Sequence, residues 1–309
     1  MHNPINLLKR TGLLVVSICF MTASVPGKVH AVLPGDLNAN GTVSISEVQK
    51  VINSFLGLIP DSPLVTAGKV VFGSPSSFTV TGTDLDKTVA TPTGACTNLT
   101  EQPGGTATLR SYSCVPSAVG ALDISISSAS NGALLSQARF SVPNPQVTMV
   151  TTMGTIVIEL NPAKAPKTVN NFLQYVREGF YDNTIIHRVV KGFVVQGGGY
   201  GTNLTQKATH AAIELEPPSV TGLTNTQGTI AMARTAELNS ATSQFYFNTV
   251  NNSPGLDLPA AGQTLGGYAV FGSIVQGMPV VQAIDVVPVD VTYNLPVTMI
   301  TITSARQTQ

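Results

Sequence analysis

Charged side chains are scarce in this chain, and their signs cancel. Lys and Arg together number 16 and Asp and Glu together number 16 in 309 residues, so only 10% of the sequence is charged. A chain without net charge produces no field that attracts nucleic acid or an acidic membrane surface, and we expect neither as a partner. Because Thr and Ser supply polarity in place of charge, the composition favours an exported protein over a cytoplasmic one.

Long apolar runs are also few, and the one near the start is short. Residues 13–23 are apolar and follow the basic Lys9 and Arg10, but the run falls below the roughly 20 residues that span a bilayer. A small-x-small cleavage site ends at Ala31, which completes the pattern of a signal peptide over residues 1–31. We expect the mature chain to be periplasmic or secreted, without a membrane span; an uncleaved anchor helix is the alternative.

The motifs of several enzyme classes are missing. No H-E-x-x-H or G-x-S-x-G sequence occurs and the 4 histidines are scattered, which leaves metal-dependent hydrolysis without support. The 3 cysteines contain no C-x-x-C pair, which excludes the usual redox and zinc arrangements. Once Cys19 leaves with the signal peptide, Cys96 and Cys114 remain. An even pair in an exported chain predicts one disulfide, with two free thiols as the alternative.

Residues 32–62 contain the spacing of a calcium loop. Oxygen ligands fall at positions 1, 3, 5, 7 and 12, with Gly41 at position 6, as in an EF-hand or dockerin-type loop. The expected Ca²⁺ ligands are Asp36, Asn38, Asn40, Thr42 through its carbonyl, and Glu47. Apolar residues at helical spacing follow, so we expect a loop-helix unit. A polar turn that binds nothing is the alternative, because the loop has two carboxylates and no second copy.

Residues 63–145 alternate short strand-like runs with Gly, Pro, Asn and Asp. This spacing is typical of a β-sandwich, and we expect a small immunoglobulin-like one. The runs lie at 69–72, 77–80, 107–109, 122–126 and 138–142. No catalytic constellation accompanies them, so we interpret the segment as a spacer or adhesion module. Residues 143–145, Pro-Asn-Pro, are expected to link it to the rest of the chain.

Residues 146–309 contain four motifs in a fixed order. They are I-I-H-R-V-V-K-G-F-V-V-Q-G-G-G-Y at 185–200, G-T-I-A-M-A-R-T at 228–235, S-A-T-S-Q-F-Y-F-N-T at 240–249 and G-Y-A-V-F-G at 267–272. In order and spacing they resemble the cyclophilin family of peptidyl-prolyl cis/trans isomerases, especially its bacterial periplasmic branch. The resemblance covers about half the chain, residues 147–302. It implies a closed antiparallel β-barrel with flanking helices, and therefore a mainly β protein.

The implied reaction, rotation about an X–Pro bond, breaks no covalent bond and needs no nucleophile, metal or cofactor. Its barrier of about 18–20 kcal/mol comes from the double-bond character of the amide, and a catalyst lowers it by favouring the twisted amide. A fixed donor near the proline nitrogen and a dry pocket for the ring would do this. The resemblance assigns these catalytic roles to Arg188, Phe193 and Gln196. His187 beside them is interpreted as a packing residue.

The resemblance also assigns a set of substrate-binding positions. They are Val194, Met232, Ala233, Arg234, Gln244, Tyr246, Leu256 and Tyr268. Gly255 and Tyr268 stand where many eukaryotic members have tryptophan and histidine, so we expect weak cyclosporin sensitivity. The implied partners are proline-containing segments of unfolded or extracytoplasmic proteins, and we expect a monomer. The alternative is a proline-peptide binding or adhesion module with little turnover, anchored by the calcium loop and the sandwich.

Overall fold

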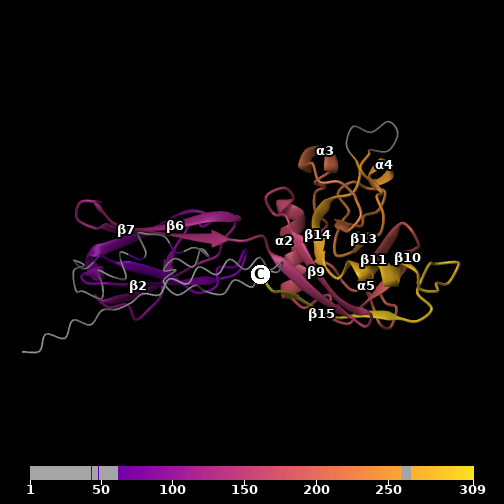
Figure 1. Cartoon of the computed structure of the whole chain (residues 1–309), viewed down its shortest axis with the longest axis horizontal. Coiled ribbons are helices and arrows are strands. Elements are labelled where there is room, and N and C mark those ends of the chain that lie inside the picture. Colours follow the sequence, from indigo (N-terminus) through magenta and orange to yellow (C-terminus); the bar gives the residue numbers. More distant parts are fainter. Residues whose placement is uncertain (1–42, 44–47, 49–61, 259–265) are drawn as a thin grey trace, which may run out of the picture.

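The structure, a computed structural model, describes residues 43, 48, 62–258 and 266–309. The predicted signal peptide and the predicted calcium ligands lie outside these residues. Figure 1 shows two lobes, one built from the earlier strands and one from the later part of the chain, with the C-terminus between them. In the part of the chain that the structure describes, no helix is long and apolar enough to cross a membrane.

The first lobe consists of two antiparallel sheets, with strand orders β1-β2-β5-β4 and β3-β6-β7. Their strands are β1 Leu64–Ala67, β2 Ser76–Thr81, β3 Thr88–Gly94, β4 Thr100–Glu101, β5 Leu109–Cys114, β6 Gly120–Ser128 and β7 Leu134–Val142. The rings of Phe78 on β2 and Phe140 on β7 meet edge to face at 5.4 Å. Cys96, just after β3, forms the expected disulfide with Cys114 on β5. The ring contact and the disulfide both join the two sheets. The immunoglobulin-like assignment and the domain boundaries stay predictions.

Two of the predicted strand positions in this lobe are wrong. Residues 69–72 form no strand, because the backbone N–H of Val71 donates to the side-chain oxygen of Ser76 at 3.1 Å and Gly73 turns the chain at φ 65°. The strand predicted at 107–109 is also misplaced, because the strand in this region, β5, begins only at Leu109. The strand β3 was not predicted, because its sequence, T-V-A-T-P-T-G, has little apolar alternation.

The second lobe is a closed barrel. Within the described residues, antiparallel strands follow one another around it in the order β10-β11-β13-β12-β14-β9-β8-β15. They are β8 Gln146–Thr151, β9 Gly154–Leu160, β10 Thr184–Val190, β11 Val194–Gly201, β12 Thr229–Met232, β13 Phe245–Asn248, β14 Val270–Gln276 and β15 Ile300–Gln307. The mainly β fold with a closed barrel and few helices, which the sequence motifs implied, is confirmed.

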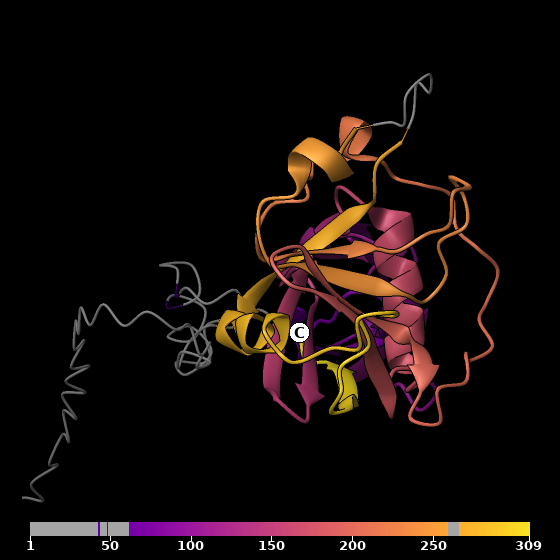
Figure 2. The same ribbon diagram turned by 90° about the vertical axis from the view of Figure 1, so that its right-hand side faces the viewer.

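Helices flank the barrel on two sides, as Figure 2 shows. They are α2 Pro166–Arg177, α3 Pro218–Thr221, α4 Ser253–Leu256 and α5 Met278–Asp285. Pro166 begins α2, where its missing N–H leaves no helical bond unmade. The apolar positions of α2 at helical spacing are buried, and the ring of Phe172 lies 5.8 Å from Phe245 and 5.1 Å from Phe271. This aromatic packing fixes β13 and β14, two of the strands that carry the candidate site.

The two lobes touch where the turn before β2 meets the end of α2. Nη2 of Arg177 donates to the carbonyl of Phe72 at 3.2 Å and to the side-chain oxygen of Gln307 at 3.1 Å. The side-chain amide of Gln307 also donates to the carbonyl of Phe72, at 3.0 Å. A Cβ at Gly73 would lie 2.3 Å from the Arg177 guanidinium. A side chain at this turn would therefore have to displace the Arg177 guanidinium.

Candidate active site

The hairpin of β10 and β11 places two of the predicted catalytic residues opposite each other. In its register Arg188 pairs with Gln196 and Val190 with Val194. Nη1 of Arg188 donates a hydrogen bond to Oε1 of Gln196 at 3.2 Å. The guanidinium is half-buried, so it keeps donors for another acceptor while one edge is fixed. The arrangement offers a positioned cation with free hydrogen-bond donors.

Gln244 extends this pair by one further side chain. The amide of Gln196 donates to Oε1 of Gln244 at 2.9 Å. A Cβ at Gly199 would come within 2.7 Å of the Gln244 side chain, so only glycine at this position on β11 leaves Gln244 its place. The structure thus brings Arg188, Gln196 and Gln244 together in one hydrogen-bonded row, although the sequence separates the glutamines by 48 residues.

An apolar cluster, separate from the barrel core, lies on the neighbouring strands. Its buried members are Val194, Ala231, Tyr246 and Val270, and the partly buried side chains packed against them are Phe193, Leu223, Ala233, Leu256 and Tyr268. We call these residues the apolar pocket, a name for the packed side chains and not for a measured cavity. Six of them were predicted site residues: Phe193, Val194, Ala233, Tyr246, Leu256 and Tyr268. Backbone pairing of Gln196 with Tyr246 across β11 and β13 sets the pocket beside the Arg188 row.

The buried side chain of Asn225 forms hydrogen bonds that hold residues of the apolar pocket in place. Its Oδ1 accepts hydrogen bonds from the Tyr246 hydroxyl at 2.7 Å and from Nδ2 of Asn248 at 3.1 Å. Its own Nδ2 donates to Oδ1 of Asp257 at 2.7 Å. Burial raises the pKa of Tyr246 well above its ordinary value, so the hydroxyl stays protonated and acts as the donor. These bonds tie β13 to the segments that carry Leu223 and Leu256.

Arg234 and Met232, which the family resemblance assigns to substrate binding, both make contacts within the fold. Nε of Arg234 donates to the carbonyl of Gly267 at 3.0 Å, and its guanidinium lies 4.7 Å from the centre of the Tyr268 ring. Arg234 therefore fixes the segment that carries Tyr268. The side chain of Met232 is buried in the main barrel core, at 1% exposure, and is not brought into the pocket. Its backbone N–H donates to the carbonyl of Ala269.

His187 precedes Arg188 on β10 and also lies near Gln244. Its ring is 4.8 Å from that of Tyr200, and Nδ1 has no hydrogen-bond partner among the described residues. Burial lowers the pKa of the imidazole from its ordinary 6.5 to about 4, so the ring is neutral at physiological pH. This environment agrees with the interpretation of His187 as a packing residue.

Several pocket residues were missed in the sequence. Leu223 and the supporting residue Asn225 precede the motif at 228–235, whereas Ala231 and Val270 lie inside the motifs at 228–235 and 267–272, and no single-position pattern marks any of them. The described residues contain no group of His, Cys, Asp and Glu that could hold a metal ion.

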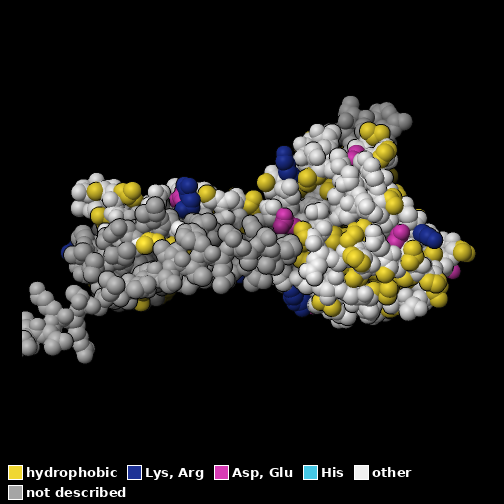
Figure 3. All heavy atoms as spheres, in the orientation of Figure 1, with side chains coloured by type: hydrophobic (Ala, Val, Ile, Leu, Met, Phe, Trp, Pro, Cys, Tyr) yellow, Lys and Arg dark blue, Asp and Glu magenta, His cyan; other side chains and the backbone are white. Residues whose placement is uncertain are grey.

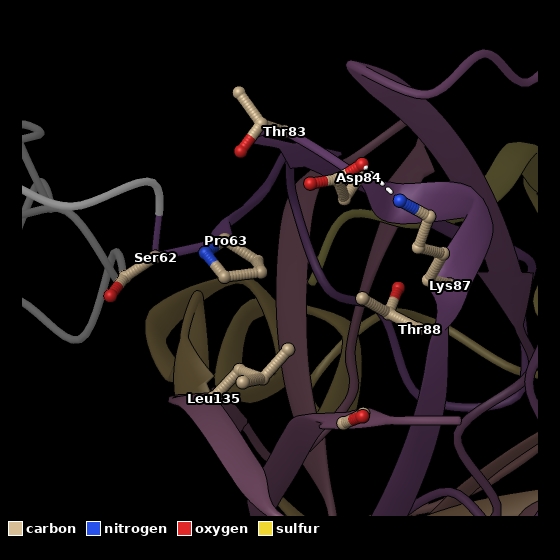
Figure 4. A pocket seen from close by; sticks show the side chains of 8 residues that line it. Ser62, Pro63, Thr83, Asp84, Lys87, Thr88 and Leu135 are labelled. Carbon is tan, nitrogen blue, oxygen red and sulfur yellow. Dashed lines mark hydrogen bonds and ion pairs between the residues drawn. The ribbon is translucent and has the colours of Figure 1, made fainter. Parts of the chain in front are cut away.

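A separate hollow on the first lobe has none of these features. It measures about 430 Å³ and is lined by Ser62, Pro63, Thr83, Asp84, Lys87, Thr88, Ser128 and Leu135. Figure 4 shows the charges of Asp84 and Lys87 paired with each other, and their nitrogen and oxygen are 2.8 Å apart. Because its charges satisfy one another at an exposed surface, we do not assign a site there.

Comparisons with known proteins agree with this geometry. Residues 146–307 match the family described as cyclophilin type peptidyl-prolyl cis-trans isomerase/CLD. A peptidyl-prolyl cis-trans isomerase of Acinetobacter baylyi is 46% identical over 164 residues, which cover 53% of this chain and 83% of that protein. Peptidyl-prolyl cis-trans isomerase B of Escherichia coli is 51% identical over 140 residues, 45% of this chain and 82% of that protein.

A solved structure of a cyclophilin type isomerase from Cryptosporidium parvum has a TM-score of 0.46 and 25% identity; the likeness covers 54% of this chain and 99% of that one. Since the family match includes more than half of this chain and the two bacterial relatives are covered over most of their length, the chain belongs to the cyclophilin-type peptidyl-prolyl cis-trans isomerases, enzymes that need no cofactor for catalysis.

Proposed function

We propose that this chain is an exported peptidyl-prolyl isomerase in which Arg188 stabilises the twisted X–Pro amide. The observation that carries the proposal is the contact of Arg188 with Gln196 beside the apolar pocket. A donor and a pocket for an apolar ring are the two parts that the reaction needs. The substrate is a proline-containing segment of an unfolded or extracytoplasmic protein.

The rate gain comes from binding the twisted amide more strongly than the planar one. When the amide twists, its nitrogen regains a lone pair and becomes a hydrogen-bond acceptor. Arg188 is always charged and presents several N–H donors in a rigid fork, of which only one contacts Gln196 here. A donor of this kind, already aimed and partly shielded from water, favours the twisted state over the planar one.

The apolar pocket holds the proline ring while the rest of the peptide rotates. Phe193 and Leu256 approach from the hairpin turn and from α4, and Val194, Tyr246 and Ala233 complete the wall. Val194 is shorter than the methionine common in the family, which leaves the pocket a slightly different shape. In this proposal Gln244 and the backbone near Met232 and Arg234 bind the substrate main chain.

Export is the second part of the proposal. It is supported by the signal-peptide pattern of residues 1–31 and by the disulfide of Cys96 with Cys114, a bond that persists in oxidising compartments. Expression of the full chain in a bacterial host, followed by fractionation and N-terminal sequencing, should yield a mature protein that starts at Val32 outside the cytoplasm. A full-length product retained in the membrane would contradict cleavage.

Calcium binding at residues 36–47 is a third, separate part. It is supported by the spacing of Asp36, Asn38, Asn40 and Glu47 in the sequence. Titration calorimetry with Ca²⁺ on the mature chain should give one site that Asp36→Ala with Glu47→Gln abolishes. An identical heat trace from wild type and variant would remove the calcium proposal and leave catalysis untouched.

A chymotrypsin-coupled assay on a proline tetrapeptide tests the enzymatic proposal. Arg188→Ala should lower the rate about a hundredfold, in the range measured for loss of a transition-state donor. Arg139→Ala, which removes an exposed arginine of the first lobe, is the matched control and should keep the wild-type rate. A folded wild type that does not accelerate isomerisation would favour the alternative, a proline-peptide binding module.

A further inference from the structure

The loop between α5 and β15, residues 286–299, exposes many apolar side chains. Val286, Val291, Tyr293, Val297 and Met299 are all exposed, Val291 by 93% and Tyr293 by 75%. Figure 3 shows hydrophobic side chains gathered on the second lobe, over the region where Figure 1 places α5 and the chain beside β10. A folded surface that keeps so many apolar groups together in water marks an interaction site.

The backbone under these side chains is fixed by hydrogen bonds. Oδ1 of Asp290 accepts from the N–H of Thr292 at 2.9 Å and from that of Tyr293 at 3.0 Å. The N–H of Asn294 donates to the carbonyl of Asp290, and the N–H of Asp290 donates to that of Leu295, both at 2.8 Å. A partner that binds here therefore loses little free energy to the ordering of the loop.

The loop covers the edge of the strand that carries Arg188. β15 pairs with β10 only over Thr184, Ile185 and Ile186. Beyond that point the N–H of Val189 donates to the carbonyl of Asn294 at 2.8 Å. The residue that follows Arg188 is thus bonded to the residue that follows Tyr293, so the exposed loop lies along the edge of β10 next to Arg188.

The other end of the same hairpin is also tied to this region. Both carboxylate oxygens of Asp285, the last residue of α5, accept from the N–H of Gly192 at 3.1 Å. Gly192 precedes Phe193 of the apolar pocket. The carboxylates of Asp285 and Asp290 are therefore occupied in holding backbone, and the chemistry that residues 286–299 offer to a partner is apolar.

We propose that the 286–299 loop is an accessory subsite that binds apolar side chains of the same polypeptide whose X–Pro bond lies at Arg188. The inference rests on the proposed function, and it narrows the substrate class to unfolded chains with apolar residues near the proline. Continuity with the candidate active site along β10 identifies the occupant as the substrate itself, since an extended chain leaving the pocket passes over neighbouring surface. Folded proteins bury such apolar segments, so the subsite selects unfolded ones.

Two matched peptides test the subsite. They share one X–Pro bond and carry either Leu or Ser at positions about three to six residues from the proline on both sides, a reach set by the roughly 3.3 Å rise per residue of an extended chain. NMR exchange spectroscopy with the full chain gives kcat/KM for each. Wild type should prefer the Leu peptide about tenfold, the effect of burying one or two apolar side chains. Val291→Ser with Tyr293→Ser should bring the Leu peptide down to the rate of the Ser peptide.

Leu134→Ser with Val89→Ser is the matched control. These residues are exposed and apolar but lie on β7 and β3 of the first lobe, so both rates should keep their wild-type values.

Equal wild-type rates for the two peptides, or a preference that persists in the loop variant, would overturn the subsite while the proposed function stands. Failure of wild type on both peptides would overturn the proposed function too. Light scattering measures whether the chain forms a dimer. A dimer that dissociates on the loop substitutions, together with no peptide preference, would assign the surface to a second copy of this chain instead.

Discussion

The side-chain amide of Gln196 donates a hydrogen bond to Oε1 of Gln244 at 2.9 Å. Gln196 accepts from Arg188 through its other side-chain atom, Oε1, at 3.2 Å. The amide group of Gln196 can satisfy both contacts only in one orientation, with oxygen toward Arg188 and nitrogen toward Gln244. The direction of the Arg188 guanidinium therefore depends on a side chain two contacts away.

Gln196→Ala should lower kcat about tenfold, because Arg188 then loses a hydrogen bond worth roughly 1.5–3 kcal/mol for a charged donor, part of which water replaces. The coupled isomerisation assay measures this. Gln174→Ala, which removes a glutamine bonded to Glu178 on the exposed face of α2, should leave kcat unchanged. A Gln196→Ala enzyme with wild-type kcat would show that Arg188 needs no orienting partner.

Tyr246→Phe should reduce the free energy of unfolding by about 1 kcal/mol, since it removes one buried hydrogen bond. The ring stays in the apolar pocket, and Oδ1 of Asn225 still accepts from Asn248, so isomerase activity should stay near wild type. Urea denaturation and the coupled assay check the two parts. Tyr293→Phe, at an exposed tyrosine, is the control and should not change stability. Equal stability losses in both variants would contradict the role of Asn225.

Gly73→Ala should destabilise the protein more than Gly132→Ala. Both glycines have positive φ, 65° and 71°, so both substitutions carry a similar backbone cost of about 1 kcal/mol. A Cβ at residue 132 meets nothing within 4 Å, whereas at residue 73 it lies 2.3 Å from the Arg177 guanidinium. Displacing Arg177 from the carbonyl of Phe72 should add about 1–2 kcal/mol.

The background variant Arg177→Ala isolates that extra cost. In it, Gly73→Ala and Gly132→Ala should have the same effect on urea denaturation of the full chain. If the two glycine substitutions already cost the same in the wild-type background, the contact between the lobes does not contribute to stability.

His187 should make stability depend on pH between about 4 and 6.5. The folded chain holds the pKa of this buried imidazole at about 4, against an ordinary 6.5. The unfolded state therefore binds more protons in this window, and the free energy of unfolding falls as the pH is lowered through it. The full loss is about 3 kcal/mol, since one pKa unit corresponds to about 1.4 kcal/mol, and it is complete below pH 4.

Urea titrations at a series of pH values compare wild type with His187→Asn, which should flatten the slope between pH 6.5 and 4. His210→Gln, at an exposed histidine paired with Glu178, should keep most of that slope. An unchanged pH dependence in His187→Asn would mean that the folded chain does not lower the pKa of His187.

The barrel was predicted from the resemblance of the motifs to a known family, and the core of the site could be predicted because its residues lie close together in the sequence. Arg188, Phe193 and Gln196 stand within one motif, and a single hairpin brings them together whatever the rest of the chain does. The helix α2 has a local signal as well, because Val169 and Phe172 stand at a spacing that a helix places on one face.

The rest of the site depends on contacts between distant segments. Val270 and Ala231 enter the pocket because β12 pairs with both β13 and β14, a pairing that no local pattern reveals. Asn225 looks like an ordinary loop residue until Tyr246 and Asp257 converge on it. The wrong strand at residues 69–72 has a similar origin, since the bond of Val71 to the Ser76 side chain and the turn at Gly73 take that segment away from the sheet.

The most direct test of the central claim separates kcat from KM for Arg188→Ala. NMR line-shape analysis of a proline tetrapeptide over a range of substrate concentrations gives both constants. If Arg188 acts on the twisted amide, kcat should fall about a hundredfold while KM changes little. A raised KM with wild-type kcat would contradict the account, because Arg188 would then bind the planar and twisted amides equally.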